Sequence, residues 1–397
     1  MPVLPQYRQF GGVHPETAAF TNMLAARGVT APHTGEPFSE AMIFGLSGGP
    51  GVGYILWEFQ EHGMKVIVLA FQHLWQYPVD YFQRLAQRMG VAVTVLETGS
   101  RKAAAQNLED TFARGRPAVA WVDRATLPYL QLPPAMIGHI GHFVVACGAE
   151  ADHVLLDDRA NRPFSVPAEK FADARARIGT YKNRLLIIEE AESGIDLADA
   201  IRQGLAACVE HLNSSSESFS LPAIRKWAKL MTDSKNKKGW PTVFKDRQGL
   251  YSTLTSIFEA IALEGAPGGL RTLYADFLHE AAPLVGGSGL DAVANLYRDL
   301  GNLWNDFAEA ALPDTVAPFR EAKQLLRERN DILTRGGDAW RATGALTARI
   351  GAIRSACNLD FPLDDVEVAE LFAELQERLR ALHAGERNAV ETLANAF

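Results

Sequence analysis

The first 190 residues alternate between short apolar runs and amphipathic segments. Residues 16–27 place Phe20, Met23 and Leu24 at the spacing of one helix face, and Gly28 follows as a C-terminal stop. Runs rich in β-branched residues and bounded by turn residues predict strands between such helices. The expected strands are 65–70, 91–96, 118–122, 143–147, 154–157 and 185–188, and further helices are expected at 79–89 and 101–114.

The pattern changes at Leu197, after which nearly every segment has the period of a helix. The polar stretch 190–195 is the expected joint. The sequence therefore predicts an α+β fold class, with an α+β domain over residues 1–190 and a mostly α-helical domain over 195–397. The expected helices of the second domain are 197–212, 221–231, 250–263, 270–282, 290–311, 315–334, 339–357 and 366–397.

Composition limits the classes of function. A chain of 397 residues with 47% hydrophobic and 22% charged residues is typical of a globular protein with two domains. The net charge of -8 argues against nucleic acid or an anionic membrane as a partner. No apolar run approaches the roughly 20 residues that span a bilayer, and residues 1–10 lack the apolar core of a signal peptide. Three distant cysteines predict a cytoplasmic protein, and they lack metal-ligand spacing, so no metal is expected. No cofactor is expected either.

The most informative segment runs from His142 to Asp158. Its two apolar runs flank a polar turn, which predicts a β-hairpin with a histidine opening the first strand and a carboxylate closing the second. A histidine can act as general base, and a carboxylate can fix its tautomer. Asp157 is an alternative to Asp158 as that carboxylate. The structural alternative is a histidine at a strand end bonded to a turn, with Asp158 capping a loop.

A glycine-rich loop, Gly45-Leu-Ser-Gly-Gly-Pro-Gly-Val-Gly53, could cradle an anion with successive backbone amides. It lacks the Gly-Lys-Ser/Thr ending of a nucleotide loop and the context of a dinucleotide site. We interpret it as a tight turn near a substrate cleft, with Ser47 and Gly48 as candidate substrate-binding residues. The basic loop 233–239 is interpreted as a solvated loop.

Several motifs together resemble a known family. They are the segments Gly12-Val-His14-Pro15-Glu16-Thr17, Ser39-Glu40-Ala-Met-Ile-Phe-Gly-Leu46, 142–158, and Gly265-Ala-Pro-Gly-Gly-Leu-Arg271-Thr-Leu-Tyr-Ala-Asp276-Phe-Leu278. In this order they resemble the butirosin biosynthesis protein H family, whose N-terminal domain is similar to the bacteriocin-processing C39 peptidases. The resemblance implies a papain-like, C39-like N-terminal domain fused to a helical domain. It also implies specialised-metabolite biosynthesis, with members that move an acyl or aminoacyl group from a carrier-protein thioester to an amine.

The resemblance assigns roles to several positions. His142 would be the general base and Asp158 its orienting acid, since the acid in the C39 pattern precedes a turn that corresponds here to Arg159-Ala160. The thiol position holds Pro15, which suits the first helical position but cannot attack a substrate, and Pro15 is a candidate substrate-binding residue. None of Cys147, Cys208 and Cys357 is an obvious substitute, because the first shares the strand of His142 and the others lie on helices of the second domain.

The remaining candidates lie around the thiol position. Gln9 lies six residues before Pro15, where the resemblance to C39-type enzymes implies an oxyanion-hole glutamine, with a surface role as the alternative. His14 and Glu16 flank Pro15 and would either take part in acid–base chemistry or cap the helix. Glu40, in the second motif, would either contact substrate or make a buried polar contact.

Two classes of function follow. The first is an enzyme in which His142 and Asp158 deprotonate an amine or alcohol that attacks an acyl thioester without a covalent acyl-enzyme, or promote cyclisation of a bound intermediate. The second is a non-catalytic pseudoenzyme that binds a metabolite or a carrier protein. Proteolysis is disfavoured because it needs the missing thiolate. The expected partners are a small-molecule substrate, with a carrier protein as a candidate, and a second copy of the chain through the long helices after Leu290.

Overall fold

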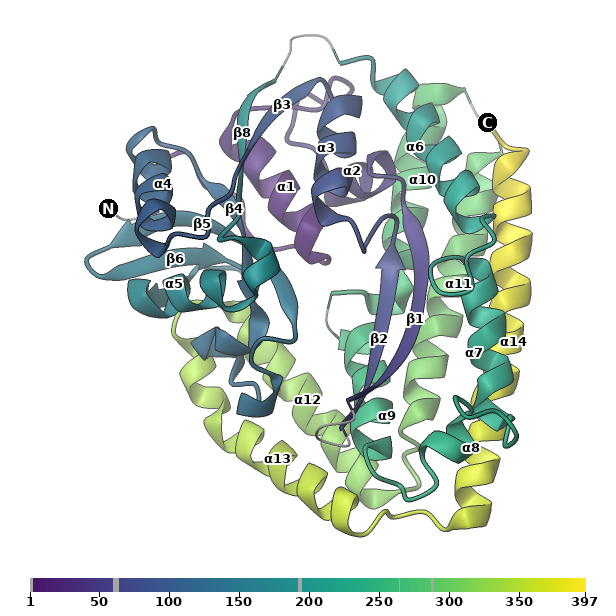
Figure 1. The fold of residues 1–397 in the computed structure, drawn as a ribbon. Helices are drawn as coiled ribbons and strands as arrows, with labels where there is room; N and C mark the ends of the chain where they lie inside the picture. The colour runs from purple at the N-terminus through teal and green to yellow at the C-terminus, as the bar shows by residue number, and fades with distance from the viewer. Residues whose placement is uncertain (1–2, 60–63, 192–194, 264, 287–288) are drawn as a thin grey trace. The chain divides into compact units, whose positions relative to one another are not determined.

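The computed structural model describes residues 3–59, 64–191, 195–263, 265–286 and 289–397 (Figure 1). The chain forms two compact units. The first, called here the sheet unit, comprises Met1–Ile43, Phe82–Asp196 and Arg329–Thr347. The second, called the helical unit, comprises Phe44–Tyr81, Leu197–Glu328 and Ala348–Phe397. None of the helices in the described part of the chain is both long and apolar enough to cross a bilayer.

The sheet unit is built on a six-stranded sheet in which every neighbouring pair is antiparallel. The strand order is β3-β8-β4-β5-β6-β7. The expected hairpin is present as β5 and β6, in which Val145 faces Asp157 and a bulge interrupts the register between Ala146 and Gly148. The strands are β3 (Val91–Leu96), β4 (Ala118–Asp123), β5 (Gly141–Glu150), β6 (His153–Asp157), β7 (Phe164–Pro167) and β8 (Leu185–Ala191).

An aromatic cluster holds the main helix of this unit against the sheet. Trp121 on β4 and Phe143 on β5 face each other across the strands, with ring centroids 5.2 Å apart. Phe82 contacts both rings and also Phe20, so α1 packs where the hairpin histidine begins its strand. The helices are α1 (Pro15–Ala26), α2 (Glu40–Leu46), α3 (Pro78–Arg88), α4 (Arg101–Ala113) and α5 (Ala168–Arg177), with short 3-10 turns at Arg124–Thr126, Pro128–Leu130, Pro134–Met136, Gly179–Tyr181 and Ala339–Thr343.

The helical unit surrounds a two-stranded antiparallel hairpin, β1 (Pro50–Phe59) and β2 (Met64–Gln72). Tyr54 on β1 stacks on Trp227 and accepts a 3.0 Å hydrogen bond from Trp240 Nε1. The helices are α6 (Leu197–Leu212), α7 (Leu221–Thr232), α8 (Trp240–Val243), α9 (Leu250–Phe258), α10 (Arg271–Val285), α11 (Leu290–Ala311), α12 (Ala317–Arg335), α13 (Gly344–Leu359) and α14 (Asp365–Ala394), with a π-turn at Glu259–Leu263 and a 3-10 turn at Pro267–Leu270. An α+β sheet region followed by a mostly helical region is confirmed.

The glycine-rich segment was wrongly expected to be a loop throughout, because β1 begins within it at Pro50. Glycine is required there by close packing rather than by a ligand. A Cβ on Gly51 would lie 2.3 Å from the Gln72 carbonyl oxygen, and one on Gly53 would lie 2.7 Å from Trp75 Nε1. Residues 44–81 group with the helical unit, and residues 329–347 group with the sheet unit. The compact units thus differ from the continuous domains 1–190 and 195–397.

Candidate active site

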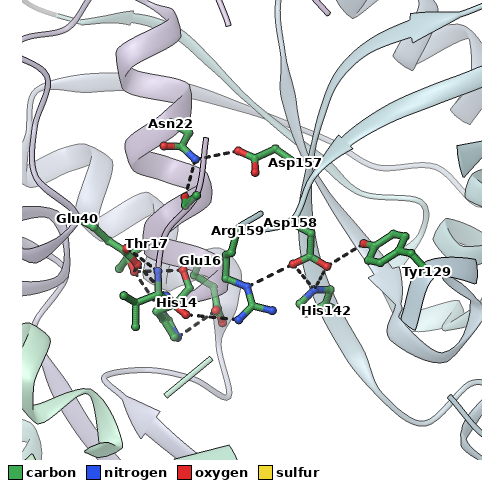
Figure 2. Close-up of polar contacts among 12 residues, drawn as sticks. His14, Glu16, Thr17, Asn22, Glu40, Tyr129, His142, Asp157, Asp158 and Arg159 are labelled. Carbon is green, nitrogen blue, oxygen red and sulfur yellow. Dashed lines mark hydrogen bonds and ion pairs between the residues drawn. The ribbon is translucent and has the colours of Figure 1, made fainter. Parts of the chain in front are cut away.

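The structure brings His142 and Asp158 together. The imidazole Nε2 lies 2.9 Å from each carboxylate oxygen (Figure 2). Both side chains are withdrawn from water, with 6% of His142 and 2% of Asp158 exposed. His142 opens the regular part of β5, and Asp158 directly follows β6, so the antiparallel hairpin places the two side chains at one end of the sheet.

This pairing determines the tautomer of His142. An ionised carboxylate only accepts hydrogen bonds, so Nε2 must carry the proton that is donated to Asp158. In the neutral imidazole Nδ1 then holds the lone pair. Nδ1 makes no hydrogen bond to any residue that the structure describes. The pair therefore has the arrangement of a general base with an orienting acid.

The charges around the pair keep Asp158 ionised. Burial alone would raise its pKa, but the charges of His142 and Arg159 and the hydrogen bonds from His142 and Tyr129 outweigh burial and hold the pKa well below its usual range. Tyr129 Oη donates to Asp158 Oδ2 at 2.8 Å. Burial lowers the pKa of His142 below 6.5, although Asp158 acts in the opposite direction. At neutral pH the imidazole is consequently neutral and able to accept a proton.

Arg159 connects this pair to the start of α1. Its Nε donates to Asp158 Oδ1 at 3.3 Å, and its Nη1 donates to the Val13 carbonyl at 3.4 Å (Figure 2). The residue has a φ of 61°, a conformation that costs a non-glycine residue about 1 kcal/mol. The two hydrogen bonds offset that cost and tie the turn after β6 to the segment that precedes Pro15.

Glu40 caps the N-terminus of α1. Its two carboxylate oxygens accept hydrogen bonds from the backbone N–H groups of Val13 and His14, at 2.7 and 2.8 Å, and Thr17 Oγ1 donates at 2.8 Å. These contacts satisfy amides that have no partner within the helix and place a negative charge at its positive end. Both oxygens are engaged by the protein in a partly buried polar contact, and contact of Glu40 with substrate stays a prediction.

Pro15 is the first residue of α1, as its sequence context predicts. The residues on either side form a pair of their own. His14 Nε2 lies 3.1 Å from Glu16 Oε2, and His14 Nδ1 lies 3.2 Å from Thr17 Oγ1. Both His14 and Glu16 are buried. These side chains border the thiol position, and their part in acid–base chemistry stays a prediction.

The other predicted residues do not join the pair through contacts that the structure describes. Gln9 is half-buried in the extended segment before α1, and its role as an oxyanion donor stays a prediction. Ser47 donates to the Phe44 carbonyl at 2.7 Å within its own turn. Gly48 has a φ of 110°, and a Cβ there would lie 2.9 Å from the His73 ring. Ser47 and Gly48 belong to the helical unit, and their contact with substrate also stays a prediction.

Asp157, the alternative to Asp158 as the carboxylate that orients His142, has a different environment. Its Oδ2 accepts a hydrogen bond from Asn22 Nδ2 at 2.8 Å (Figure 2). The same oxygen accepts from Tyr7 Oη at 2.6 Å, while Oδ1 is buried without a partner. Burial, together with the charge of Asp158, raises the pKa of Asp157 to about 7 despite those two hydrogen bonds. The two adjacent carboxyls therefore differ in charge below neutral pH, and only Asp158 serves His142.

Asp157→Asn should make stability less sensitive to pH. The folded pKa lies above that of the unfolded chain, so the contribution of Asp157 to stability is fully present below about pH 4, falls as pH rises and is lost above about pH 7. Asparagine resembles the protonated carboxyl. The free energy of unfolding of the variant, relative to that of the unaltered protein, should increase by on the order of 2 kcal/mol as pH rises from 5 to 8. Denaturant unfolding at both pH values measures this, with the exposed Asp152→Asn as control; a difference independent of pH would contradict it.

The three cysteines are poor nucleophiles. Cys147, Cys208 and Cys357 are all buried. Burial raises the pKa of Cys147 well above its usual value, that of Cys208 to about 12 and that of Cys357 to about 11. Cys147 Sγ also donates to the Leu155 carbonyl within the hairpin. The reactive thiolate form is therefore suppressed at each position.

Replacing any one cysteine with alanine should leave turnover within about twofold of the unaltered protein, since the thiolate form of each is suppressed. Iodoacetamide should likewise fail to inhibit. Steady-state rates of the three variants, with circular dichroism to confirm folding, measure this. Loss of turnover in one well-folded variant would identify a displaced nucleophile.

Two residues of the site had no signal in the sequence. Tyr129 is 29 positions from the carboxylate that it contacts, in an apolar stretch that predicts only burial. Arg159 occupies the turn position after Asp158, and its second contact is 146 positions away. The residues that the structure describes contain no group of three or more histidine, cysteine, aspartate or glutamate side chains that could hold a metal ion.

Comparison with known proteins identifies two family domains along the chain. Residues 14–159 match the family model described as Butirosin biosynthesis protein H, N-terminal, and residues 169–331 match the model described as Domain of unknown function (DUF4872). The chain therefore carries a butirosin biosynthesis protein H N-terminal domain followed by a DUF4872 domain. Among solved structures it is similar to a protein from Bacillus anthracis described as a C39-like peptidase, with a TM-score of 0.33 and 15% identity over 48% of this chain and 98% of that chain. A search of curated proteins finds no match.

Proposed function

We propose that this protein is an enzyme of specialised-metabolite biosynthesis that transfers an acyl or aminoacyl group from a thioester to an amine. The observation that carries the proposal is the buried His142–Asp158 pair, whose Nε2 is held at 2.9 Å by an ionised carboxylate while Nδ1 retains its lone pair. The match of residues 14–159 to the butirosin biosynthesis protein H model supports a role in specialised-metabolite biosynthesis.

The proposed step needs no thiol from the protein. The amine nitrogen attacks the thioester carbonyl carbon, and a proton moves from that nitrogen to His142 Nδ1. The C–S bond then breaks, and the departing sulfur takes the proton from the imidazolium, so the neutral base is restored. Asp158 stabilises the transient imidazolium through Nε2. Proton transfer of this kind contributes about 100- to 10,000-fold, and holding the two reactants together contributes further.

Pro15 is consistent with direct transfer. In family members that use a thiol, the first position of the corresponding helix is cysteine, whereas here it is proline. Arg159 also brings a positive charge to the segment that precedes Pro15. We propose a carrier-protein thioester as the acyl donor and the cytoplasm as the site of action. Cyclisation of a bound intermediate would use the same proton transfer within one molecule.

Turnover should rise with pH and reach its plateau by neutral pH. The base must be deprotonated, and burial lowers the pKa of His142, so the midpoint should lie below 6.5. Aminoacyl thioesters of a carrier protein, incubated with small amines from pH 4.5 to 8 and followed by mass spectrometry, provide the test. Circular dichroism at each pH separates titration from acid unfolding. A profile that is flat across this range would exclude a histidine base and favour the pseudoenzyme that binds a metabolite or carrier protein.

A further inference from the structure

A basic groove lies between α7 and α14 in the helical unit. The residues proposed for catalysis, His142 and Asp158, belong to the sheet unit. The two helices lie side by side (Figure 1) and enclose a cavity of about 500 Å³. Its lining includes Arg225 and Lys229 from α7 and Arg380 and His383 from α14. A cavity of this volume is the size of a small-molecule site.

The groove concentrates positive charge on a chain whose net charge is -8. Arg225 and Lys229 are exposed, lie four residues apart on one face of α7, and have no ion-pair partner among the residues that the structure describes. The loop that follows α7 adds three exposed lysines, at positions 235, 237 and 238. Elsewhere on α14, by contrast, Arg378 and Arg387 are each paired with a glutamate four residues away.

The acidic residues near the groove are engaged in other contacts. Asp233 lines the groove, but its Oδ1 accepts hydrogen bonds from the backbone amides of Lys235 and Asn236, so this carboxylate shapes the turn after α7. Glu386 is fully buried in an ion pair with Arg271. Glu377 pairs with Arg380 on the solvent side, where both are exposed and the pair contributes little.

The floor of the groove is preorganised. Gln376 is buried, and its Nε2 donates 2.7 Å hydrogen bonds to the Ala228 carbonyl and to Thr232 Oγ1. Thr232 therefore accepts from Gln376, and its own hydroxyl proton can be donated to a ligand. Burial and the charges of Arg387 and Arg225 hold the pKa of His383 below its usual value, so its ring is neutral and supplies a hydrogen bond rather than a charge.

We infer that this groove binds a phosphorylated small molecule through its phosphoryl group. Two guanidinium groups, an ammonium group and a hydroxyl donor provide the charge and the directional hydrogen bonds that phosphate oxygens accept. The volume beyond the phosphoryl group accommodates the organic part of the ligand. This site is independent of the reaction at His142 and would stand if that reaction were of another kind.

Calorimetric titration of the full chain with inorganic pyrophosphate, ADP and coenzyme A, in a phosphate-free buffer at low salt, tests the inference. At least one probe should bind, with an affinity that falls as sodium chloride is raised. The double variant Arg225→Glu/Lys229→Glu should weaken binding at least tenfold. Each charge contact is worth about 1 kcal/mol in water, which alone changes the dissociation constant several-fold. Stronger binding of ADP or coenzyme A than of pyrophosphate would identify an organic portion that the groove contacts.

Lys226→Glu is the matched control, because it makes the same change of charge on the same helix at a residue that does not line the groove. It should change affinity less than twofold. Equal loss in the control, or equal binding of citrate at the same ionic strength, would show general attraction of anions and overturn the inference. Absence of binding by all three phosphoryl probes at about 10 mM would also overturn it. Even a weak specific site, with a dissociation constant of about 1 mM, would be mostly occupied at that concentration. Arg225 and Lys229 are exposed and Lys226 is half-buried, and an unchanged melting temperature confirms that the variants fold.

Discussion

His142→Ala should lower turnover at least 100-fold while leaving substrate affinity nearly unchanged. The substitution removes the atom that accepts the proton of the attacking amine, and general-base catalysis is worth about 100- to 10,000-fold. Because the effect falls on the chemical step, kcat should fall and KM should change little. Asp158→Asn should cause a related loss, since an amide can donate to Nε2 and so stabilise the tautomer that carries its proton on Nδ1.

His153→Ala is the matched control for this experiment. His153 lies in the same hairpin, at the start of β6, and pairs with the exposed Asp152 rather than with Asp158. It should keep full turnover. Melting temperatures of all three variants separate catalysis from folding. If His142→Ala turned over at the rate of His153→Ala, His142 would have no role in the reaction, and a binding protein would be the better account.

The sequence predicted the sheet well where strands consist of consecutive β-branched and apolar residues. All six expected strands are present, because runs such as 118–122 and 185–188 can be buried efficiently only as central strands. It did not predict β1, in which glycines at 51 and 53 dilute the pattern. Those glycines are explained only by atoms of β2 and its following turn, which pack against them from about 20 positions away.

In the site too, contacts within one hairpin could be predicted from the sequence, whereas contacts between residues far apart in the chain could not. The hairpin brings His142 and Asp158 together through local sequence, so their pairing could be predicted. Tyr129, Arg159 and Glu40 act through contacts that depend on the complete fold, at separations of 29, 146 and 26 positions. The environment of Asp157 could not be predicted from the sequence either, because its partners Tyr7 and Asn22 come from the beginning of the chain.

Glu386→Gln should destabilise the protein by about 3–5 kcal/mol, the cost of removing one partner from a buried ion pair. Glu386 and Arg271 have no exposed side-chain surface. Glu386 Oε1 accepts hydrogen bonds from Arg271 Nε at 2.7 Å and from Trp304 Nε1 at 2.8 Å. Glutamine preserves the volume and one acceptor but removes the negative charge, which leaves the guanidinium charge buried without compensation.

The pair also links α10 and α14 to β1, because Arg271 Nη2 donates to the Gly51 carbonyl at 3.0 Å. Denaturant unfolding measures the loss, and Glu391→Gln on the same helix is its control. Glu391 forms an exposed pair with Arg387 and should cost less than about 0.5 kcal/mol. Arg271→Met combined with Glu386→Gln should recover part of the stability, since the uncompensated charge is removed as well. If Glu386→Gln cost no more than Glu391→Gln, the helical unit would not depend on this ion pair, and its stability would come from apolar packing alone.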